Sequence, residues 1–185
     1  MAVRFAPHRH RAREQHFISH YGQGKRTVAT ETILLVEDNP DDIELALLGF
    51  SRNNRQENGS HYYVIEVARN GEEALDFLFA RGKFSDRPVG SNPNLILLDV
   101  NLPGISGLEV LQEIRSHRSY QHTPVVILTT SDETSDIIEG YNLGVNSYLQ
   151  KPVSFNAFVE LLQQIGQYWL KNNITPPKSA LSALR

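Results

Sequence analysis

From Thr32 onward, short apolar runs alternate with stretches in which apolar residues recur every three or four positions. The short runs have the length and composition of buried strands, and the longer stretches have the period of amphipathic helices. Five strand-then-helix units in succession predict an α/β fold with a doubly wound, five-stranded parallel sheet and helices on both faces. The predicted strands are Thr32 to Val36, Tyr62 to Val67, Leu95 to Leu98, Val125 to Leu128 and Ser147 to Gln150.

Capping and turn residues place the predicted helices between these strands. Pro40 opens the first helix with Asn39 as its cap, and Asn70-Gly71 opens the second. The others are predicted after Leu102-Pro103-Gly104, from about Asp132 to Asn142 before Gly144, and from near Ser154. Two polar, turn-rich segments, Arg52 to Ser60 and Ala80 to Pro93, are predicted to be surface loops.

Composition narrows the class of protein. The 185 residues suit a single domain, and 40% hydrophobic with 21% charged residues is ordinary for a globular protein. The chain has no cysteine, which excludes disulfides, thiolate zinc sites and cysteine nucleophiles. No apolar run approaches the roughly 20 residues of a membrane helix, so we expect a cytoplasmic protein without membrane contact.

Residues 1–29 differ from the rest of the chain. Residues 1–27 contain six Lys or Arg and one acid, whereas the whole chain has a net charge of −3. We expect a disordered or weakly helical, solvated arm at 1–29, a globular domain at 30–172 and a tail at 173–185. Alternatives for the arm are a histidine metal site, a contact with nucleic acid or another anionic surface, and a misassigned start with translation from near Val28.

Polar residues end three of the predicted strands. Asp99, Thr129 and Lys151 each follow an apolar run, and Glu37 and Asp38 follow the first strand. The carboxyl ends of parallel strands share one edge of a sheet, where ligands bind. We therefore expect these five residues to meet in one pocket.

The acids of this pocket indicate phosphoryl chemistry. Three carboxylates close together repel one another unless a cation joins them, and Mg²⁺ binds through one or two carboxylates together with phosphate oxygens. A phosphoryl group on Asp99 would have its charge neutralised by Mg²⁺ on one side and by Lys151 on the other.

Each position also has a simpler interpretation. Acids after a strand often mark the first turn of a helix, which alone would explain Asp41 and Asp42 and part of the Glu37-Asp38 pattern. Thr129 can be an ordinary β-branched strand residue. Lys151 can be an exposed lysine, and Asp99 can be purely structural.

The joint spacing of these residues resembles the receiver domain of response regulators over about Thr30 to Tyr168. Pro103, Gly107 and Thr129 lie four, eight and thirty positions after Asp99, and Lys151-Pro152 begins fifty-two after it. The resemblance implies a flavodoxin-like sheet of order 2-1-3-4-5. It also implies that Asp38, Asp99 and the Asn101 carbonyl coordinate Mg²⁺, with Glu37 acting through water.

The implied function is signalling rather than enzymatic turnover. Asp99 would accept a phosphoryl group from a sensor histidine kinase, with Mg-dependent self-phosphorylation and autodephosphorylation as the only chemistry. The segments VEDNPDDIELAL, TTS and KPVSFNAF with the later YWL are similar to stand-alone regulators that partner cyanobacterial phytochrome kinases. We expect no nucleic-acid contact from this domain.

Two other classes of function are alternatives. A haloacid-dehalogenase-type phosphatase also uses an aspartate at a strand end, but it needs an acid two residues later, where this chain has Asn101. A phosphorylation-independent binding module is the second alternative. The complete site argues against it.

Phosphorylation is expected to move a switch. The Thr129 hydroxyl would turn towards the phosphoryl oxygens, and Tyr148 would fill the space that it leaves. The alternative for Tyr148 is a half-buried strand aromatic with its hydroxyl in water.

The last predicted helix carries more large apolar residues than one sheet face requires. We expect part of this stripe to form a symmetric homodimer interface with the fourth helix and fifth strand. The alternative is a stripe buried entirely within one chain. The predicted interface residues are Phe155, Phe158, Tyr168 and Trp169.

Overall fold

The computed structural model describes residues 29–55, 61–88 and 91–176. The predicted arm lies outside these ranges except for Ala29, as do residues 56–60 of one predicted loop, residues 89–90 of the other and residues 177–185 of the tail.

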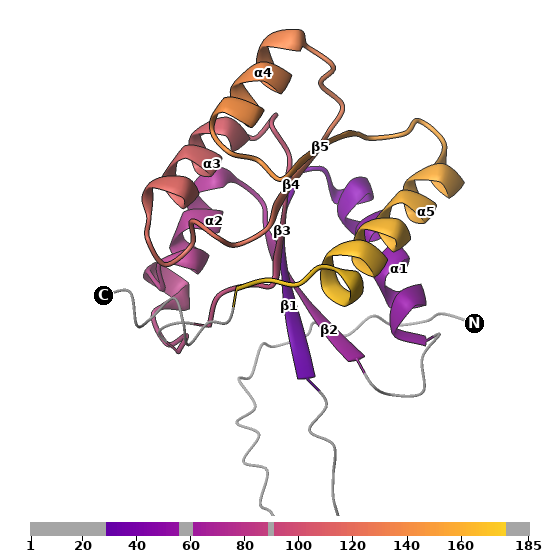
Figure 1. The fold of residues 1–185 in the computed structure, drawn as a ribbon, viewed down its shortest axis with the longest axis horizontal. Coiled ribbons are helices and arrows are strands. Elements are labelled where there is room, and N and C mark those ends of the chain that lie inside the picture. Colours follow the sequence, from indigo (N-terminus) through magenta and orange to yellow (C-terminus); the bar gives the residue numbers. More distant parts are fainter. Residues whose placement is uncertain (1–28, 56–60, 89–90, 177–185) are drawn as a thin grey trace, which may run out of the picture.

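Five parallel strands alternate with five helices, as the sequence pattern predicts (Figure 1). The sheet order is β2-β1-β3-β4-β5, which confirms the doubly wound, flavodoxin-like fold. The strands are β1 (Ala29–Val36), β2 (His61–Ala68), β3 (Leu95–Leu98), β4 (Val125–Thr129) and β5 (Ser147–Gln150). The helices are α1 (Pro40–Arg55), α2 (Gly71–Leu78), α3 (Gly107–Ser116), α4 (Thr134–Asn142) and α5 (Phe155–Gly166).

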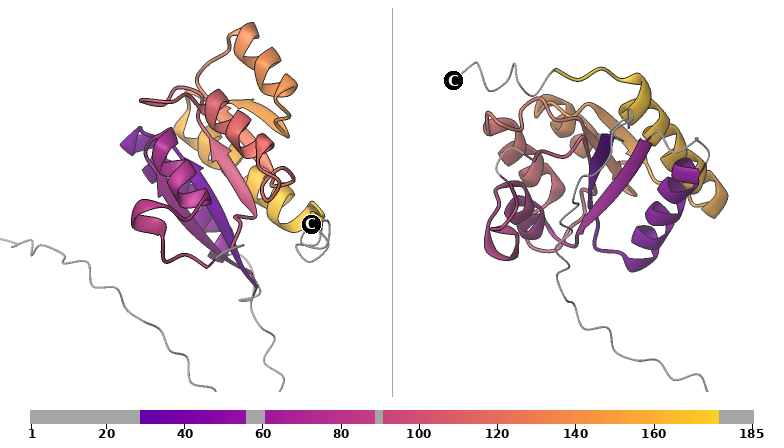
Figure 2. Two further views of the ribbon diagram at one scale, coloured as in Figure 1. Left: turned by 90° about the vertical axis from the view of Figure 1, so that its left-hand side faces the viewer. Right: turned by 90° about the horizontal axis from the view of Figure 1, so that it is seen from below.

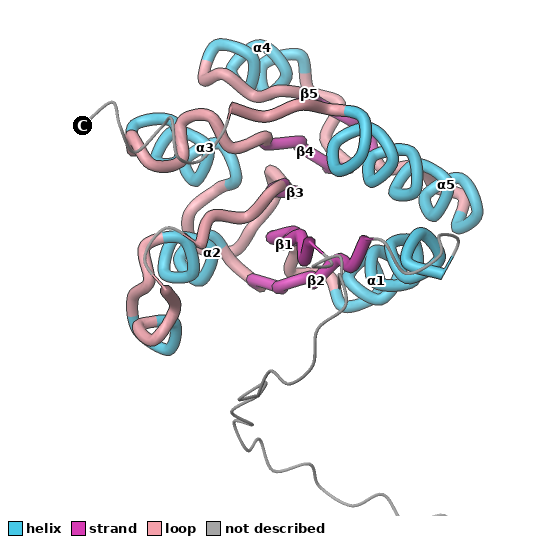
Figure 3. Tube along the Cα trace, turned by 60° about the horizontal axis from the view of Figure 1, so that its bottom comes forward, coloured by secondary structure: helices cyan, strands magenta, loops and turns pink. Residues whose placement is uncertain are grey.

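The sheet lies between two helical layers. Figure 3 shows the strands with α1 and α5 on one side and with α2 and α3 on the other, and the views of Figure 2 agree. Side chains alternate along each strand, so that neighbouring residues enter opposite cores. Leu34, Val36, Ile96 and Leu98 pack with α2 and α3, whereas Ile33, Leu35, Leu95 and Leu97 pack with α1 and α5.

Local capping explains where the helices begin. The Asn39 side chain accepts a 2.9 Å hydrogen bond from the Asp41 amide at the start of α1. Ser106 and Glu109 form a reciprocal capping box at the start of α3. Gly144 has a φ of +89° just after α4, a conformation that glycine adopts without strain.

Some predicted element boundaries differ from those of the structure. α1 continues to Arg55 through residues expected to be loop, because the segment 51–55 contains no Gly or Pro that would end the helix. The second predicted loop contains a short 3₁₀ turn at Gly82–Phe84, which is compatible with a turn-rich loop. α4 begins at Thr134 rather than Asp132, since Ser131 and Asp132 still belong to the loop after β4.

Two further features are the weak packing of α4 and a π-helical turn after α5. α4 is thinly anchored, because Gly140 is its only buried residue. A π-helical turn at Gln167–Asn172 follows α5 and buries Leu170 in the core.

Candidate functional site

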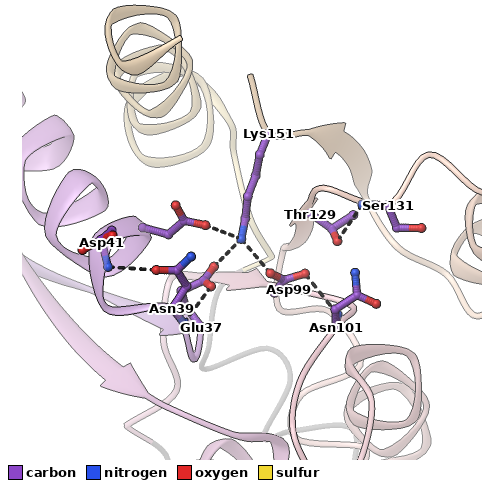
Figure 4. A network of polar contacts seen from close by, with 9 residues as sticks. Glu37, Asn39, Asp41, Asp99, Asn101, Thr129, Ser131 and Lys151 are labelled. Carbon is purple, nitrogen blue, oxygen red and sulfur yellow. Dashed lines mark hydrogen bonds and ion pairs between the residues drawn. The ribbon is translucent and has the colours of Figure 1, made fainter. Parts of the chain in front are cut away.

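The site is built around Asp99, which follows four fully buried residues of β3. Its own side chain is nearly inaccessible to solvent. One carboxylate oxygen accepts a 3.1 Å hydrogen bond from the Asn101 amide, and the other accepts one of 2.6 Å from the Lys151 ammonium (Figure 4). The carboxylate is therefore held at a fixed position at the carboxyl edge of the sheet.

Lys151 reaches this position from the end of β5. Its backbone amide donates to the Thr129 carbonyl at 2.7 Å, which continues the pairing of β4 and β5 by one residue. Its ammonium lies 2.6 Å from Glu37, 2.6 Å from Asp99 and 2.9 Å from Asp42. Burial alone would lower the pKa of Lys151, but the hydrogen bonds to Asp99 and Glu37 outweigh it and raise that pKa.

Glu37 and Asp38 lie in different environments although they are adjacent. Glu37 is buried, and one of its oxygens also accepts a hydrogen bond from the Asn39 amide at 3.2 Å. Burial raises the pKa of Glu37 to about 7, against the opposing effect of Lys151. The Asp38 side chain is exposed to solvent.

Thr129 is fully buried at the end of β4. Its hydroxyl oxygen accepts a 3.2 Å hydrogen bond from the Ser131 amide, and the Ser131 carbonyl accepts one of 3.3 Å from the Tyr148 hydroxyl. Tyr148 is half-buried and packs on the core beneath α4. Thr129, Ser131 and Tyr148 thus form one connected group beside Asp99.

Comparison with known proteins decides the family. The response regulator receiver domain matches residues 33–163. The chain belongs to this family.

Similar proteins include response regulators, one of them named as a cyanobacterial phytochrome response regulator. Response regulator Rcp1 of Synechocystis sp. is 36% identical over 146 residues, which cover 79% of this chain and 93% of Rcp1. The solved structure of the phosphorylated cyanobacterial phytochrome response regulator RcpA has a TM-score of 0.72 at 36% identity, over 80% of this chain and 100% of RcpA. The Mn²⁺-bound form of Rcp1 has a TM-score of 0.69 at 37% identity, over 80% of this chain and 99% of that structure. This receiver domain is therefore a response regulator related to phytochrome response regulators.

The receiver site has the donor chemistry of a divalent cation site. Glu37, Asp42 and Asp99 place three carboxylates around the single ammonium of Lys151, which leaves excess negative charge at the sheet edge. These are the hard oxygen donors that Mg²⁺ prefers. Over the described ranges, however, no group of three or more acidic or histidine side chains is already arranged to hold a metal ion.

Asp42 is the site residue that sequence reasoning missed. Its position in the first turn of α1 suggested only a favourable interaction with the helix dipole. Nothing in the local sequence distinguishes Asp42 from Asp41, since both are acids in the first turn of α1. Its contact with Lys151, 109 residues away, depends on tertiary structure.

The predicted interface residues separate into two groups. Phe155 is 48% exposed and Tyr168 is 54% exposed, so both lie on the surface. Phe158 is 3% exposed and packs in the core, so including it in a surface patch was wrong. Trp169 is partly buried against the same core and meets the Tyr168 ring edge-on.

Within the ranges that the structure describes, no helix combines the length and apolarity needed to cross a bilayer.

Proposed function

We propose that Asp99 accepts a phosphoryl group from the phosphohistidine of a sensor histidine kinase, and that the chain signals through the conformational change that follows. The observation that carries this proposal is the buried Asp99 carboxylate, held 2.6 Å from Lys151 at the edge of the sheet that also bears Glu37 and Thr129.

The transfer exchanges one bond for another. A carboxylate oxygen of Asp99 attacks phosphorus, and the bond between phosphorus and the histidine nitrogen breaks with its electron pair going to that nitrogen. The phosphohistidine ring, protonated at its other nitrogen, leaves as neutral imidazole. Later attack by water on phosphorus breaks the acyl phosphate and returns the Asp99 carboxylate with inorganic phosphate.

The surrounding side chains have distinct roles. The Lys151 ammonium donates to the developing charge on the phosphoryl oxygens, and its contact with Asp99 places it within reach. The Thr129 hydroxyl donates to another phosphoryl oxygen after turning away from the Ser131 amide. Both groups favour the phosphorylated state.

A magnesium ion, when bound, would neutralise phosphoryl charge that one ammonium cannot balance alone. The proposed ligands are oxygens of Asp38 and Asp99 and the Asn101 carbonyl, with Glu37 assisting. The exposure of Asp38 supports a direct role, whereas Glu37 is already held by Lys151.

The proposed output is a shift of α4 and β5. Turning the Thr129 hydroxyl removes a contact of Ser131, whose carbonyl is the Tyr148 partner. Tyr148 would then move inwards against the core. The thin anchoring of α4 supports it as the element that responds.

The phosphodonor, the cellular location and the oligomeric state are also proposals. The likeness to RcpA and Rcp1 supports a phytochrome-type kinase as the phosphodonor and action in the cytoplasm. Exposed apolar side chains on α4 and around α5 support a symmetric homodimer formed by this face. These residues are Ile138, Tyr141, Val153, Phe155 and Tyr168.

Labelling with acetyl phosphate tests the central step. Asp99→Asn should abolish hydroxylamine-sensitive labelling, because the amide cannot form an acyl phosphate. Asp132→Asn is the matched control, since Asp132 is an exposed aspartate in the loop after β4. Full hydroxylamine-sensitive labelling of Asp99→Asn would refute the assignment and would favour a phosphorylation-independent binding module.

A further inference from the structure

The Lys151 ammonium has a partner for every proton that it can donate. An ammonium group has three N–H donors. Three carboxylates from three different segments lie within hydrogen-bond distance of it, namely Glu37 after β1, Asp42 in α1 and Asp99 after β3. An arriving phosphoryl oxygen can therefore accept a hydrogen bond from Lys151 only if one of these carboxylates releases it.

Asp42 is the partner that is released most easily. Its contact is 2.9 Å long, against 2.6 Å for each of the other two. Its side chain is 24% exposed, whereas those of Glu37 and Asp99 are 4% and 6% exposed. Water can hydrate the Asp42 carboxylate as it separates, but a buried carboxylate that lost the ammonium would remain unpaired.

We propose that Asp42 is a positioning residue that holds the Lys151 ammonium in the unphosphorylated state and yields it to the phosphoryl group. This inference rests on the proposed phosphorylation of Asp99. The phosphoryl group brings nearly two negative charges and several acceptor oxygens, so it competes well against a single partly hydrated carboxylate. Asp42 therefore opposes phosphorylation by stabilising the resting arrangement of the lysine.

The general repulsion caused by the Asp42 charge is a different effect from the hydrogen bond that Asp42 accepts from Lys151. Any acid near the site repels an incoming anion, whether or not it touches Lys151. Asp41 is the matched control, because it is the preceding residue in the same helical turn, carries the same charge and is exposed to solvent. Its amide donates to the Asn39 side chain, an interaction that a side-chain substitution at Asp41 leaves in place.

The first measurement is the affinity for beryllofluoride, a phosphoryl analogue, at saturating Mg²⁺. Asp42→Asn and Asp42→Ala should each bind it about threefold to tenfold more tightly than wild type, the effect of removing one charge-assisted competitor. Asp41→Asn should stay within about twofold of wild type. The asparagine variant keeps the shape of the side chain, and circular dichroism checks that both variants are folded.

The second measurement needs neither metal nor phosphoryl analogue. Nuclear magnetic resonance follows the exchange of the Lys151 ammonium protons with water in the resting protein. Asp42→Ala should accelerate this exchange, because one N–H loses its acceptor, and Asp41→Asn should not. An effect of charge alone would change the exchange rate about equally in Asp41→Asn.

The outcomes separate this inference from the proposed function. Beryllofluoride affinities that match between the Asp42 and Asp41 variants, or an unchanged exchange rate in Asp42→Ala, would overturn the role of Asp42 while leaving phosphorylation of Asp99 intact. A wild-type protein that neither binds beryllofluoride nor becomes labelled would overturn both proposals.

Discussion

The Ser131 hydroxyl donates a 2.7 Å hydrogen bond to the Asp136 carboxylate, and this contact joins the loop after β4 to the first turn of α4. Because Ser131 also contacts Thr129 and Tyr148, it connects the site with the helix proposed to respond. A change at Thr129 can therefore reach α4 through a continuous set of hydrogen bonds.

Ser131→Ala should weaken this connection. We expect a loss of about 1 kcal/mol in the free energy of unfolding, the usual worth of one such hydrogen bond. Beryllofluoride with Mg²⁺ should shift the resonances of Tyr148 and of residues 134–142 in wild type, and should shift those of 134–142 less in the variant. Ser135→Ala, at an exposed position of α4, is the control. Equal shifts in both variants would exclude Ser131 as the link.

Gly107→Ala should displace the backbone of Asp99 and so distort the site. A Cβ at this position would lie 1.9 Å from the Asp99 carbonyl oxygen, so the backbone of Asp99 has to move. We expect destabilisation of at least about 2 kcal/mol, together with slower labelling. Gly140→Ala is the matched control in α4, where the nearest atom would be a side-chain carbon of Ile127 at 3.3 Å. Urea denaturation of both variants tests this, and similar stabilities would contradict it.

The sequence predicted the five strands and the residues that follow them because alternation and buried runs report burial directly. It did not predict the contact of Asp42 with Lys151. The acids in the first turn of a helix look alike in sequence until the positions of the strand ends across the site are known. Phe158 was misjudged for a related reason. A helical stripe shows which residues are apolar, but the distinction between Phe158, inside, and Phe155, at the surface, depends on how α5 lies against α1 and the sheet.

The stability of the metal-free protein should depend on Glu37 between pH 4.5 and 7. Burial raises its pKa from 4.5 to about 7, so the folded state binds this proton more tightly than the unfolded state does. The resulting stabilisation is complete below the unfolded pKa and is lost as the pH rises to the folded pKa. Relative to Glu37→Gln, wild type should therefore become less stable across this interval and change little above it. Urea denaturation at several pH values measures the difference, and a constant difference would contradict the expectation.

Removal of Mg²⁺ should stop labelling of Asp99. EDTA is expected to abolish transfer from acetyl phosphate, and added Mg²⁺ should restore it. Calorimetric titration should show Mg²⁺ affinity falling by about tenfold or more in Asp38→Ala, the loss expected for a direct charged ligand. Glu37→Gln should have a smaller effect, because Lys151 already holds that carboxylate. A larger loss in Glu37→Gln than in Asp38→Ala would reverse the two proposed roles.

Exposed apolar residues at the start of α5 and in the turn after it should determine whether two chains associate. Phe155 and Tyr168 are large, half-exposed side chains, and β5, the edge strand beside α4, completes the proposed face. Phe155→Ala with Tyr168→Ala should convert a dimer to a monomer without unfolding it, because neither side chain belongs to the buried core. Trp169 is a poorer choice, since it packs against that core and its removal would also lower stability.

Light scattering at several protein concentrations, with and without beryllofluoride and Mg²⁺, measures this association. Leu47→Ala is the control, because Leu47 is an exposed apolar residue on α1, a helix that is not part of the proposed face. We expect the mass of two chains for wild type and for the control, and of one chain for the double variant. The comparison between the two conditions also shows whether the phosphoryl analogue strengthens the contact. A wild-type mass of one chain under every condition would exclude the dimer, and a dimer that survives in the double variant would place its interface on another face.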